Sequence, residues 1–386
     1  MHYLDHAATT PMHPQAIDAM VAVLRESYGN PSGVHDVSAQ ARLVLEKARD
    51  EVAAVLGCRA RELVFTGGGT ESLNLALRGV AVAPGELPVV LTSAIEHDAV
   101  TETARWLAAT GQATHEVLPV TKVGVVDLDR AGEIFARHCT AAVTLAVMAV
   151  NNEIGTVQPL ADLASMLRVR VPRSVVVVDA VQAPVWLDIR PLCALADFVA
   201  VSAHKFGGPK GVGALTVREG LSLTPLLHGG GQERERRSGT QNVAGIAGMA
   251  RAAAITDIGR EAVGRRVASL RDRLVDGLVA SINGCVETVS DRSTKVAGNA
   301  HMTIDGVESE AVLVLLNDAG VAASAGSACA SGALHVSPVL LAMGVPPLQA
   351  AGALRLTLGE TSTDRDVDAV LDVLPAVVRR LRSRAA

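Results

Sequence analysis

Lys205 is the residue whose type and setting point most directly to covalent chemistry. It lies in a small, polar and glycine-rich stretch at 202–211, which follows the apolar run at 198–201. An amine just beyond a buried strand and ahead of a glycine-rich bend is well placed to form an imine with an aldehyde cofactor. The alternative is an ordinary loop lysine, because most lysine side chains lie in water.

Cys329 is the second reactive candidate. The residues around it, 323–332, are small and polar, a composition that predicts an accessible loop rather than a core segment. An accessible thiol can attack as a thiolate, whereas a buried thiol is usually inert. The other four cysteines lack this setting, and we interpret them as packing residues: Cys58, Cys139, Cys193 and Cys285. The scattered spacing, without Cys-x-x-Cys, indicates neither a disulfide framework nor a metal site.

A glycine-rich turn at 66–72 follows the strand-like residues 63–65 and precedes a helix-like segment at 73–78. Glycine lets backbone N–H groups approach an anion closely, and the start of a helix adds its dipole, so a phosphate group fits this turn. The turn has neither the lysine of a Walker loop nor the glycine spacing of a dinucleotide fingerprint. On its own, it is weak evidence for a phosphate site.

Further strand-like runs at 89–92, 142–150, 175–179 and 198–201 are separated by segments long enough for helices. This alternation predicts a mostly parallel sheet that helices cover on both faces. Ligands of such sheets bind at the carboxyl ends of the strands. Polar candidates follow several of these runs: His97, Asn152, Asp179, Gln182 and Lys205.

The length of 386 residues favours two domains over one core. Beyond residue 245 the pattern becomes helix-rich and charged, and a final helix is predicted from Thr363 onward. We expect an N-terminal segment at 1–15 that packs with a small domain, a large domain at 16–255 and a small C-terminal domain at 256–386. No linker-like tract separates them, so we expect close packing.

Composition bounds the possible partners. The net charge of -5 gives no general attraction to nucleic acid or membranes. The longest apolar run, 140–150, is too short to span a bilayer, and the first residues do not resemble a secretory signal. We therefore expect a soluble cytoplasmic protein. Aromatic residues make up only 2%, so a planar cofactor must stack on something else.

With these residues in view, the sequence resembles the cysteine desulfurases. These are class-V aminotransferase-like enzymes of fold type I that use pyridoxal 5'-phosphate, and the similar subgroup contains the nitrogen-fixation and iron–sulfur housekeeping enzymes. The resemblance runs nearly end to end through ordered segments, namely 4–11, 29–32, 65–72, 96–97, 151–155, 178–182, 202–213, 229–234, 237–240, 327–329 and 355–359.

The resemblance implies an α/β fold, with a large domain built on a mostly parallel seven-stranded sheet and a smaller α+β C-terminal domain. It implies that Lys205 carries the cofactor and then acts as the base at Cα. Asp179 would hold the pyridinium nitrogen protonated, because a nearby anion favours the charged ring. Gln182 would reach the ring hydroxyl, and His97 would stack on the ring and relay protons.

The remaining roles also come from the resemblance. The cofactor phosphate would be bound by Gly69 and Thr70, by Ser202 and His204, and by Thr240 of a partner subunit, which implies a homodimer. Arg355, assisted by Asn152, would bind the substrate carboxylate through its planar guanidinium group.

The implied reaction converts L-cysteine to L-alanine and leaves a persulfide on Cys329, which passes sulfur to an acceptor protein. Iron–sulfur assembly, tRNA thiolation and DNA thiolation stay open as destinations, as does transient cluster binding by Cys329. The alternatives are a selenocysteine lyase, an aminotransferase and a scaffold without turnover. Two positions depart from the family pattern: His6, where asparagine is common, and Glu360, where a basic or aromatic residue is frequent.

Overall fold

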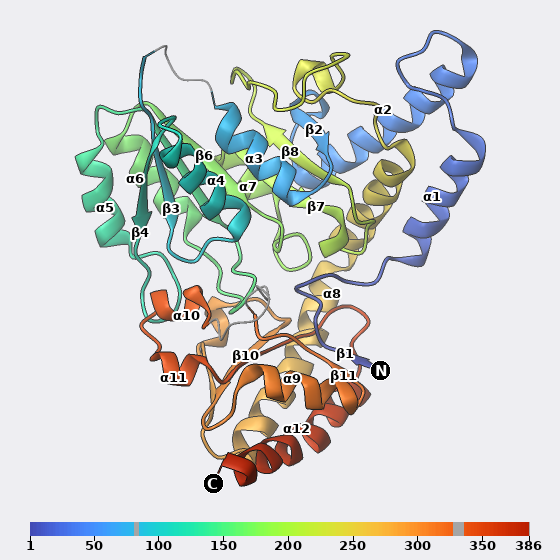
Figure 1. Ribbon diagram of the computed structural model, residues 1–386. Helices are drawn as coiled ribbons and strands as arrows, with labels where there is room; N and C mark the ends of the chain where they lie inside the picture. The colour runs from blue at the N-terminus through green and yellow to red at the C-terminus, as the bar shows by residue number, and fades with distance from the viewer. Residues whose placement is uncertain (81–84, 327–335, 386) are drawn as a thin grey trace.

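The computed structural model describes residues 1–80, 85–326 and 336–385. A seven-stranded sheet with the order β2-β8-β7-β6-β5-β3-β4 forms its centre (Figure 1). Every strand but β8 runs in one direction. Valine-containing apolar runs form the inner strands β3, β5, β6 and β7, because both faces of the sheet are buried there. The strands are β2 (Leu63–Thr66), β3 (Val89–Ser93), β4 (Thr114–Leu118), β5 (Val143–Met148), β6 (Ser174–Asp179), β7 (Phe198–Ser202) and β8 (Gly213–Val217).

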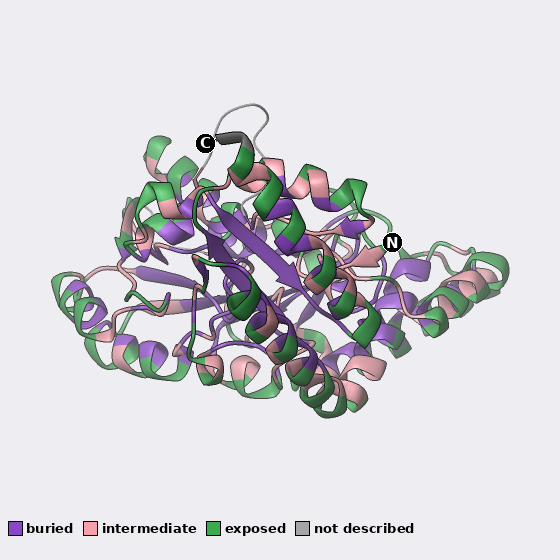
Figure 2. Cartoon of the chain, turned by 90° about the horizontal axis from the view of Figure 1, so that it is seen from below, coloured by how far each residue is buried: buried purple, intermediate pink, exposed green. Residues whose placement is uncertain are grey.

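Helices cover both faces of this sheet, so most of its strands lie in the interior (Figure 2), whereas the edge strand β4 is only partly buried. One face packs against α2 (Asp36–Leu56), α5 (Leu128–Arg137) and α6 (Leu160–Arg170). The other face packs against α3 (Gly69–Gly79) and α4 (Asp98–Ala109). The predicted α/β layer architecture is confirmed by this arrangement.

A second, smaller sheet with the order β12-β10-β9 forms the C-terminal region. Its core packs against α12 and the last turns of α8. The N-terminal strand β1 pairs in parallel with β11, and Leu4 is buried in the same core. The elements are β1 (His2–Tyr3), β9 (Cys285–Glu287), β10 (Asn299–Ile304), α9 (Ser309–Asp318), β11 (Val321–Ala322), α10 (Pro338–Ala342), α11 (Pro347–Ala350), β12 (Ala353–Thr357) and α12 (Asp364–Ala385).

The helix α8 (Val243–Ser281) connects the two sheets as one continuous element. Its first turns pack against α1 (Pro14–Glu26) and α2, and its last turns pack against α12. Residue 255 therefore lies inside a helix, and the domain boundaries expected at 15 and 255 stay a prediction. Within the described ranges, no helix combines the length and the apolar character that crossing a membrane requires.

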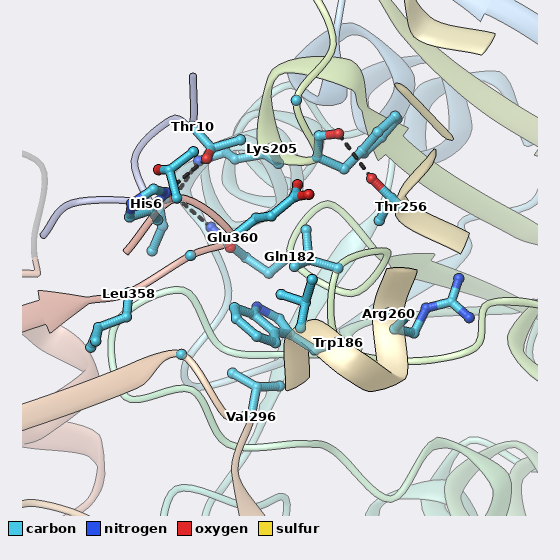
Figure 3. A pocket seen from close by; sticks show the side chains of 18 of the residues that line it. His6, Thr10, Gln182, Trp186, Lys205, Thr256, Arg260, Val296, Leu358 and Glu360 are labelled. Atoms are coloured by element: carbon cyan, nitrogen blue, oxygen red, sulfur yellow. Dashed lines mark hydrogen bonds between the residues drawn. The ribbon is translucent and has the colours of Figure 1, made fainter. Parts of the chain in front are cut away.

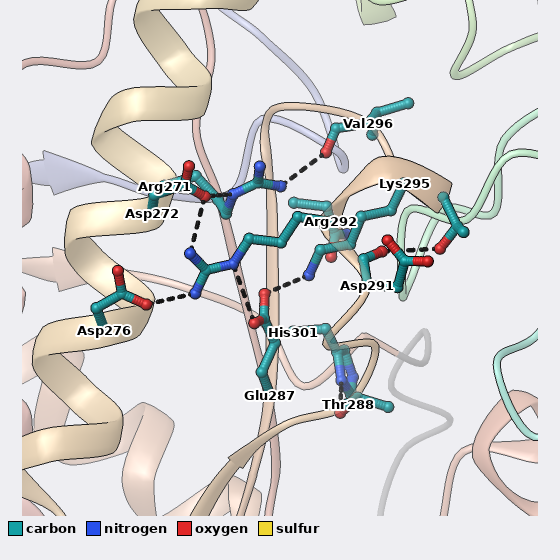
Figure 4. A network of polar contacts seen from close by, with 12 residues as sticks. Arg271, Asp272, Asp276, Glu287, Thr288, Asp291, Arg292, Lys295, Val296 and His301 are labelled. Carbon is teal, nitrogen blue, oxygen red and sulfur yellow. Dashed lines mark hydrogen bonds and ion pairs between the residues drawn. The ribbon is translucent and has the colours of Figure 1, made fainter.

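A polar network fixes the segment that joins β9 to β10 (Figure 4). Arg292 bridges Asp276 at 2.6 Å and Glu287 at 3.2 Å, and Glu287 also accepts a hydrogen bond from Lys295 at 2.6 Å. The backbone N–H of Val296 then donates to the carbonyl of Gly155 at 2.9 Å. The network thus holds the C-terminal region against the loop that follows β5.

A left-handed turn precedes the segment at 237–240. Glu233, Arg234 and Glu235 have φ values of 49°, 57° and 64°, which residues other than glycine adopt at a cost of about 1 kcal/mol each. The buried carboxylate of Glu233 holds the turn, because it accepts two hydrogen bonds at 2.8 Å from Arg49 and one at 3.0 Å from the N–H of Phe65.

We expect Glu235→Gly to raise the free energy of unfolding by about 0.5 to 1 kcal/mol, because glycine adopts the left-handed conformation without a Cβ clash. The Glu235 side chain is exposed, so little contact is lost. Urea denaturation checks this value. The control Glu51→Gly, at an exposed position inside α2, should lower stability by about 1 kcal/mol. Equal losses in both variants would contradict the assignment of strain to residue 235.

Candidate active site

The carboxyl ends of β2, β3, β5, β6 and β7 meet at one edge of the large sheet, where they line a cavity of about 730 Å³. The C-terminal region closes it through β12. The structure brings together nearly all the residues proposed from the sequence, namely Gly69, Thr70, His97, Asn152, Asp179, Gln182, Ser202, His204, Lys205 and Arg355. Thr240 is exposed and does not line this cavity, and Cys329 lies outside the described residues.

Lys205 enters the cavity from a single 3-10 turn that directly follows β7. Gly207, with a φ of 78°, then turns the chain away. The Nζ atom donates hydrogen bonds to the carbonyl oxygens of Ala7 at 2.6 Å and Ala8 at 2.9 Å. Burial, and then the positive charge of Arg355, lower the pKa of Lys205 from 10.5 to about 8. The amine is therefore far closer to its neutral, nucleophilic form than a solvated lysine.

Asp179 and His97 both line this cavity. Asp179 ends β6, and His97 lies between β3 and α4. The Oδ1 atom of Asp179 accepts a hydrogen bond from the N–H of Val181 at 2.9 Å. Burial raises the pKa of this carboxyl group, while His97 and Lys205 oppose the rise. His97 caps α4, because its Nδ1 atom accepts from the N–H of Ala99 at 3.0 Å. The proton of the neutral His97 ring is thereby assigned to Nε2.

Two glycines, Gly69 in the glycine turn and Gly213 at the start of β8, leave no room for a side chain. A Cβ atom on Gly69 would lie 2.7 Å from Val181, and one on Gly213 would lie 2.7 Å from the backbone of Gly68. The first N–H groups of α3 have no partner within the helix, so they can bind an anion. His204 adds no charge at neutral pH, because burial and then Lys205 lower its pKa to about 4.

Arg355 projects from β12 and is held on two sides. Its Nη2 atom donates to Asp5 at 2.8 Å, and its Nη1 atom donates to the carbonyl oxygen of Asn152 at 2.9 Å. The buried Nε atom has no hydrogen-bond partner among the described residues. A planar donor group fixed in this way can bind a carboxylate in the cavity. Asn152 contributes to this arrangement through its backbone carbonyl, a distinction that the sequence could not reveal.

Comparisons with known proteins agree with this geometry. The family model described as Aminotransferase class-V matches residues 2–370. The chain belongs to the class-V aminotransferase family. An IscS-like cysteine desulfurase from Mycobacterium tuberculosis is 44% identical, over 100% of this chain and 98% of that protein. A solved structure described as a NifS-like protein has a TM-score of 0.91 and 34% identity, with 98% of this chain and 99% of that chain covered.

A third comparison concerns a ligand complex. The structure described as SspA in complex with cysteine is 28% identical, with a TM-score of 0.81 over 94% of this chain and 100% of that one. The family match and the likeness to these structures confirm the predicted fold type and the resemblance from which it came.

Sequence reasoning missed two N-terminal contributions to this class-V site. Asp5 forms the ion pair with Arg355, and the carbonyl of Ala7 accepts hydrogen bonds from both Lys205 and the Nε2 atom of Gln182, the latter at 2.7 Å. Both residues lie in the segment at 4–11, which contributed to the family resemblance but was assigned no role in the site. A backbone acceptor has no sequence signature, so only the fold could reveal Ala7.

One interpretation of the cysteines is wrong. Cys139, which follows α5 and was interpreted as a packing residue, is exposed. The interpretation rested on the absence of a small, polar loop around Cys139, and this absence does not by itself imply burial. Cys285 is buried, whereas Cys58 and Cys193 are half-buried.

Glu96 is a buried carboxyl group on the wall of the same cavity. Its Oε1 atom accepts from the N–H of Met148 at 3.1 Å and from the hydroxyl of Ser93, while Oε2 has no partner among the described residues. Burial is the main cause that raises its pKa from 4.5 to about 8, and Asp179 adds to the rise. Glu96 is therefore mostly protonated at neutral pH.

The raised pKa of Glu96 predicts that the free energy of unfolding depends on pH. Because the folded-state pKa is raised, the protonated carboxyl group favours the folded state fully below about pH 4.5, and this contribution is lost as the pH rises to about 8. Glu96→Gln cannot ionise, so its free energy of unfolding relative to the parent should increase by about 2 to 4 kcal/mol between about pH 5 and pH 8. Denaturation at both pH values checks this. The exposed control Glu102→Gln should show no such trend.

Proposed function

We propose that this protein is a cysteine desulfurase that uses pyridoxal 5'-phosphate. The proposal rests on the arrangement of four groups around one cavity. They are the Lys205 amine with its lowered pKa, the buried carboxyl group of Asp179, the glycine turn at Gly69 and the guanidinium group of Arg355. The curated relatives at 44% and 39% identity, which cover 100% and 99% of the chain, are named cysteine desulfurases.

The residues of the cavity fit the cofactor that the sequence resemblance implies. Lys205 would attach its aldehyde, and Asp179 would face its ring nitrogen. The N–H groups of Gly69 and Thr70, with the hydroxyl of Ser202, would hold its phosphate. When bound, pyridoxal phosphate supplies an electron sink that weakens the bonds at Cα of an amino acid.

The protein's own groups then have separate tasks. Arg355 orients the substrate through its carboxylate, and the neutral Nζ of Lys205 takes the proton from Cα. The Cys329 thiolate attacks the sulfur atom of the substrate, the Cβ–S bond breaks, and alanine leaves. One cysteine and the Cys329 thiol thus give alanine and a Cys329 persulfide. The assignment of Cys329 rests on the resemblance.

We further propose a homodimer in which Thr240 reaches the phosphate of the partner's site. An ion pair between Arg237 and Glu71, at 2.8 Å, fixes the segment before Thr240 on the first turn of the chain's own α3. Thr240 is exposed in the single chain, as a residue that completes another subunit's site must be. The persulfide sulfur passes to an acceptor protein of iron–sulfur assembly, tRNA thiolation or DNA thiolation.

Incubation of the purified protein with L-cysteine and a thiol reductant tests the activity. We expect alanine and sulfide in equal amounts, with no keto acid. A keto acid without sulfide would indicate an aminotransferase, and turnover of selenocysteine alone would indicate a selenocysteine lyase. Either result contradicts the proposal.

A further inference from the structure

A second cavity, of about 320 Å³, lies next to Lys205 and away from the glycine turn (Figure 3). Its walls come from every part of the chain that meets at the junction of the two sheets. They are the N-terminal segment, the loop after β5, the turns after β6 and β7, the middle of α8, the segment that enters β10 and the residues after β12. Pockets of this size between structural units are common positions for small-molecule sites.

Most of this junction cavity is apolar. Trp186, Phe206 and Ile255 line it, and Figure 3 shows Gln182 between the Trp186 ring and the Glu360 side chain on the cavity wall. Glu360 is 48% exposed, and its nearest ionic contact is His13 at 3.4 Å. The cavity thus combines an aromatic wall with a carboxylate that retains free acceptor capacity.

The cationic groups at this cavity are already committed to the protein. Arg260 donates to the carbonyl of Pro184 at 3.0 Å and to Asp257 at 2.7 Å. Lys205 donates to the carbonyl oxygens of the N-terminal segment. His6 is neutral at physiological pH, because burial lowers its pKa to about 4. Glu360, whose carboxylate lies 3.4 Å from His13, is the acidic residue in the cavity lining.

The two positions that depart from the family pattern both line this cavity. His6 packs tightly there, since a Cβ atom on Gly359 would lie 2.3 Å from its ring. Glu360 follows directly in the chain. Neither His6 nor Glu360 has a role in the proposed reaction, and both lie at the same cavity.

The junction cavity and the active-site cavity share a wall made by Ala7, Gln182 and Lys205. The Ala7 carbonyl accepts hydrogen bonds from both of the other two residues. A molecule in the junction cavity would therefore contact the segment that holds the Lys205 amine, without occupying the substrate position.

We propose that the junction cavity is a second ligand site that binds a small aromatic molecule carrying a protonated amine. The aromatic group packs against Trp186 and Phe206, and the ammonium group pairs with Glu360. This inference goes beyond the proposed desulfurase activity and does not depend on it.

The probe for the test is N,N-dimethylphenethylamine, whose tertiary nitrogen is protonated at neutral pH and cannot condense with an aldehyde. Trp186 reports its binding by fluorescence in a Trp106→Phe background, because the sequence has two tryptophans. Trp106 lies elsewhere, under the guanidinium group of Arg78. From the size of the probe we expect a Kd of about 1 mM.

Two variants test the position of the probe. Gly259→Leu places a side chain into the cavity from α8, where a Cβ atom would meet only Val263 at 3.9 Å, and should weaken binding at least about tenfold. Gly264→Leu is the matched control, because it lies in the same helix, has open space around its Cβ position and does not line the cavity. It should bind the probe like the parent.

Glu360→Gln tests the charge. It should weaken binding of the amine about fivefold and leave binding of the neutral analogue 2-phenylethanol unchanged. The amine should inhibit or stimulate alanine release without competing with cysteine. Unchanged binding in Gly259→Leu, unchanged amine affinity in Glu360→Gln, or competition with cysteine would each overturn the proposal.

Discussion

Replacing Lys205 by alanine is expected to lower kcat for alanine formation from cysteine by at least about a thousandfold, because the base at Cα is lost. The lowered pKa of about 8 makes Lys205 effective as a base near neutral pH. The variant should keep its fold, since the two hydrogen bonds lost go to backbone carbonyls at the edge of a cavity that water can enter.

Lys210→Ala is the matched control for this experiment. Lys210 lies in the same loop but is exposed and does not line the cavity, so its removal should leave kcat within about twofold. Circular dichroism and thermal unfolding check that both variants are folded. A Lys205→Ala protein that keeps more than a tenth of the parent activity would mean that another group moves the proton.

Arg355→Ala is expected to lower kcat/KM for cysteine by about 100- to 1000-fold, mainly through a higher KM. The guanidinium group is the fixed cation at the β12 side of the cavity, and charge-assisted bonds to a carboxylate contribute about 1.5 to 3 kcal/mol each. Arg355→Lys should recover only part of the loss, because an ammonium group lacks the planar pair of donors.

Cysteamine, which lacks the carboxylate, separates substrate binding from general damage to the site. The parent and Arg355→Ala should process cysteamine at similar low rates if Arg355 acts on the carboxylate. Asp5→Asn should keep the guanidinium group in place with less than about a tenfold effect on cysteine turnover. An equal loss with both substrates in Arg355→Ala would assign the residue a structural role instead.

Much of the site follows from one rule about parallel sheets. Asp179 ends one strand-like run and Lys205 follows another, and the carboxyl ends of parallel strands share an edge, so their convergence could be predicted from the sequence. The phosphate site was predicted from the glycine-rich turn at 66–72, which precedes a helix. These are local patterns, which short stretches of sequence display in full.

Contacts across the whole chain could not be predicted in this way. Asp5 meets Arg355 across 350 positions, and Ala7 meets Lys205 across 198. Nothing in the local sequence encodes these pairings, because they depend on how β1 docks on β11 and on the position of β12. Glu96 was recognised as part of a motif, yet its protonation follows from burial that only the packed fold defines.

The sequence pattern also could not predict that the two ends of α8 pack against different sheets. The change to charged, helix-rich sequence near residue 245 indicated a new unit, whereas the structure has one helix that begins on the large sheet and ends on the small one. Helical periodicity does not reveal which sheet each turn contacts. The junction cavity beside this helix was for the same reason invisible in the sequence.

The central claim is that a lysine-bound cofactor and a thiol at position 329 cooperate to remove sulfur from cysteine. Its most direct test is a brief incubation with sulfur-labelled cysteine without reductant, followed by mass mapping of peptides. We predict one labelled sulfur on Cys329 for each alanine released, and no stable adduct in Cys329→Ser. Label on exposed Cys139 or another cysteine instead, or alanine release without any labelled protein, would contradict the account.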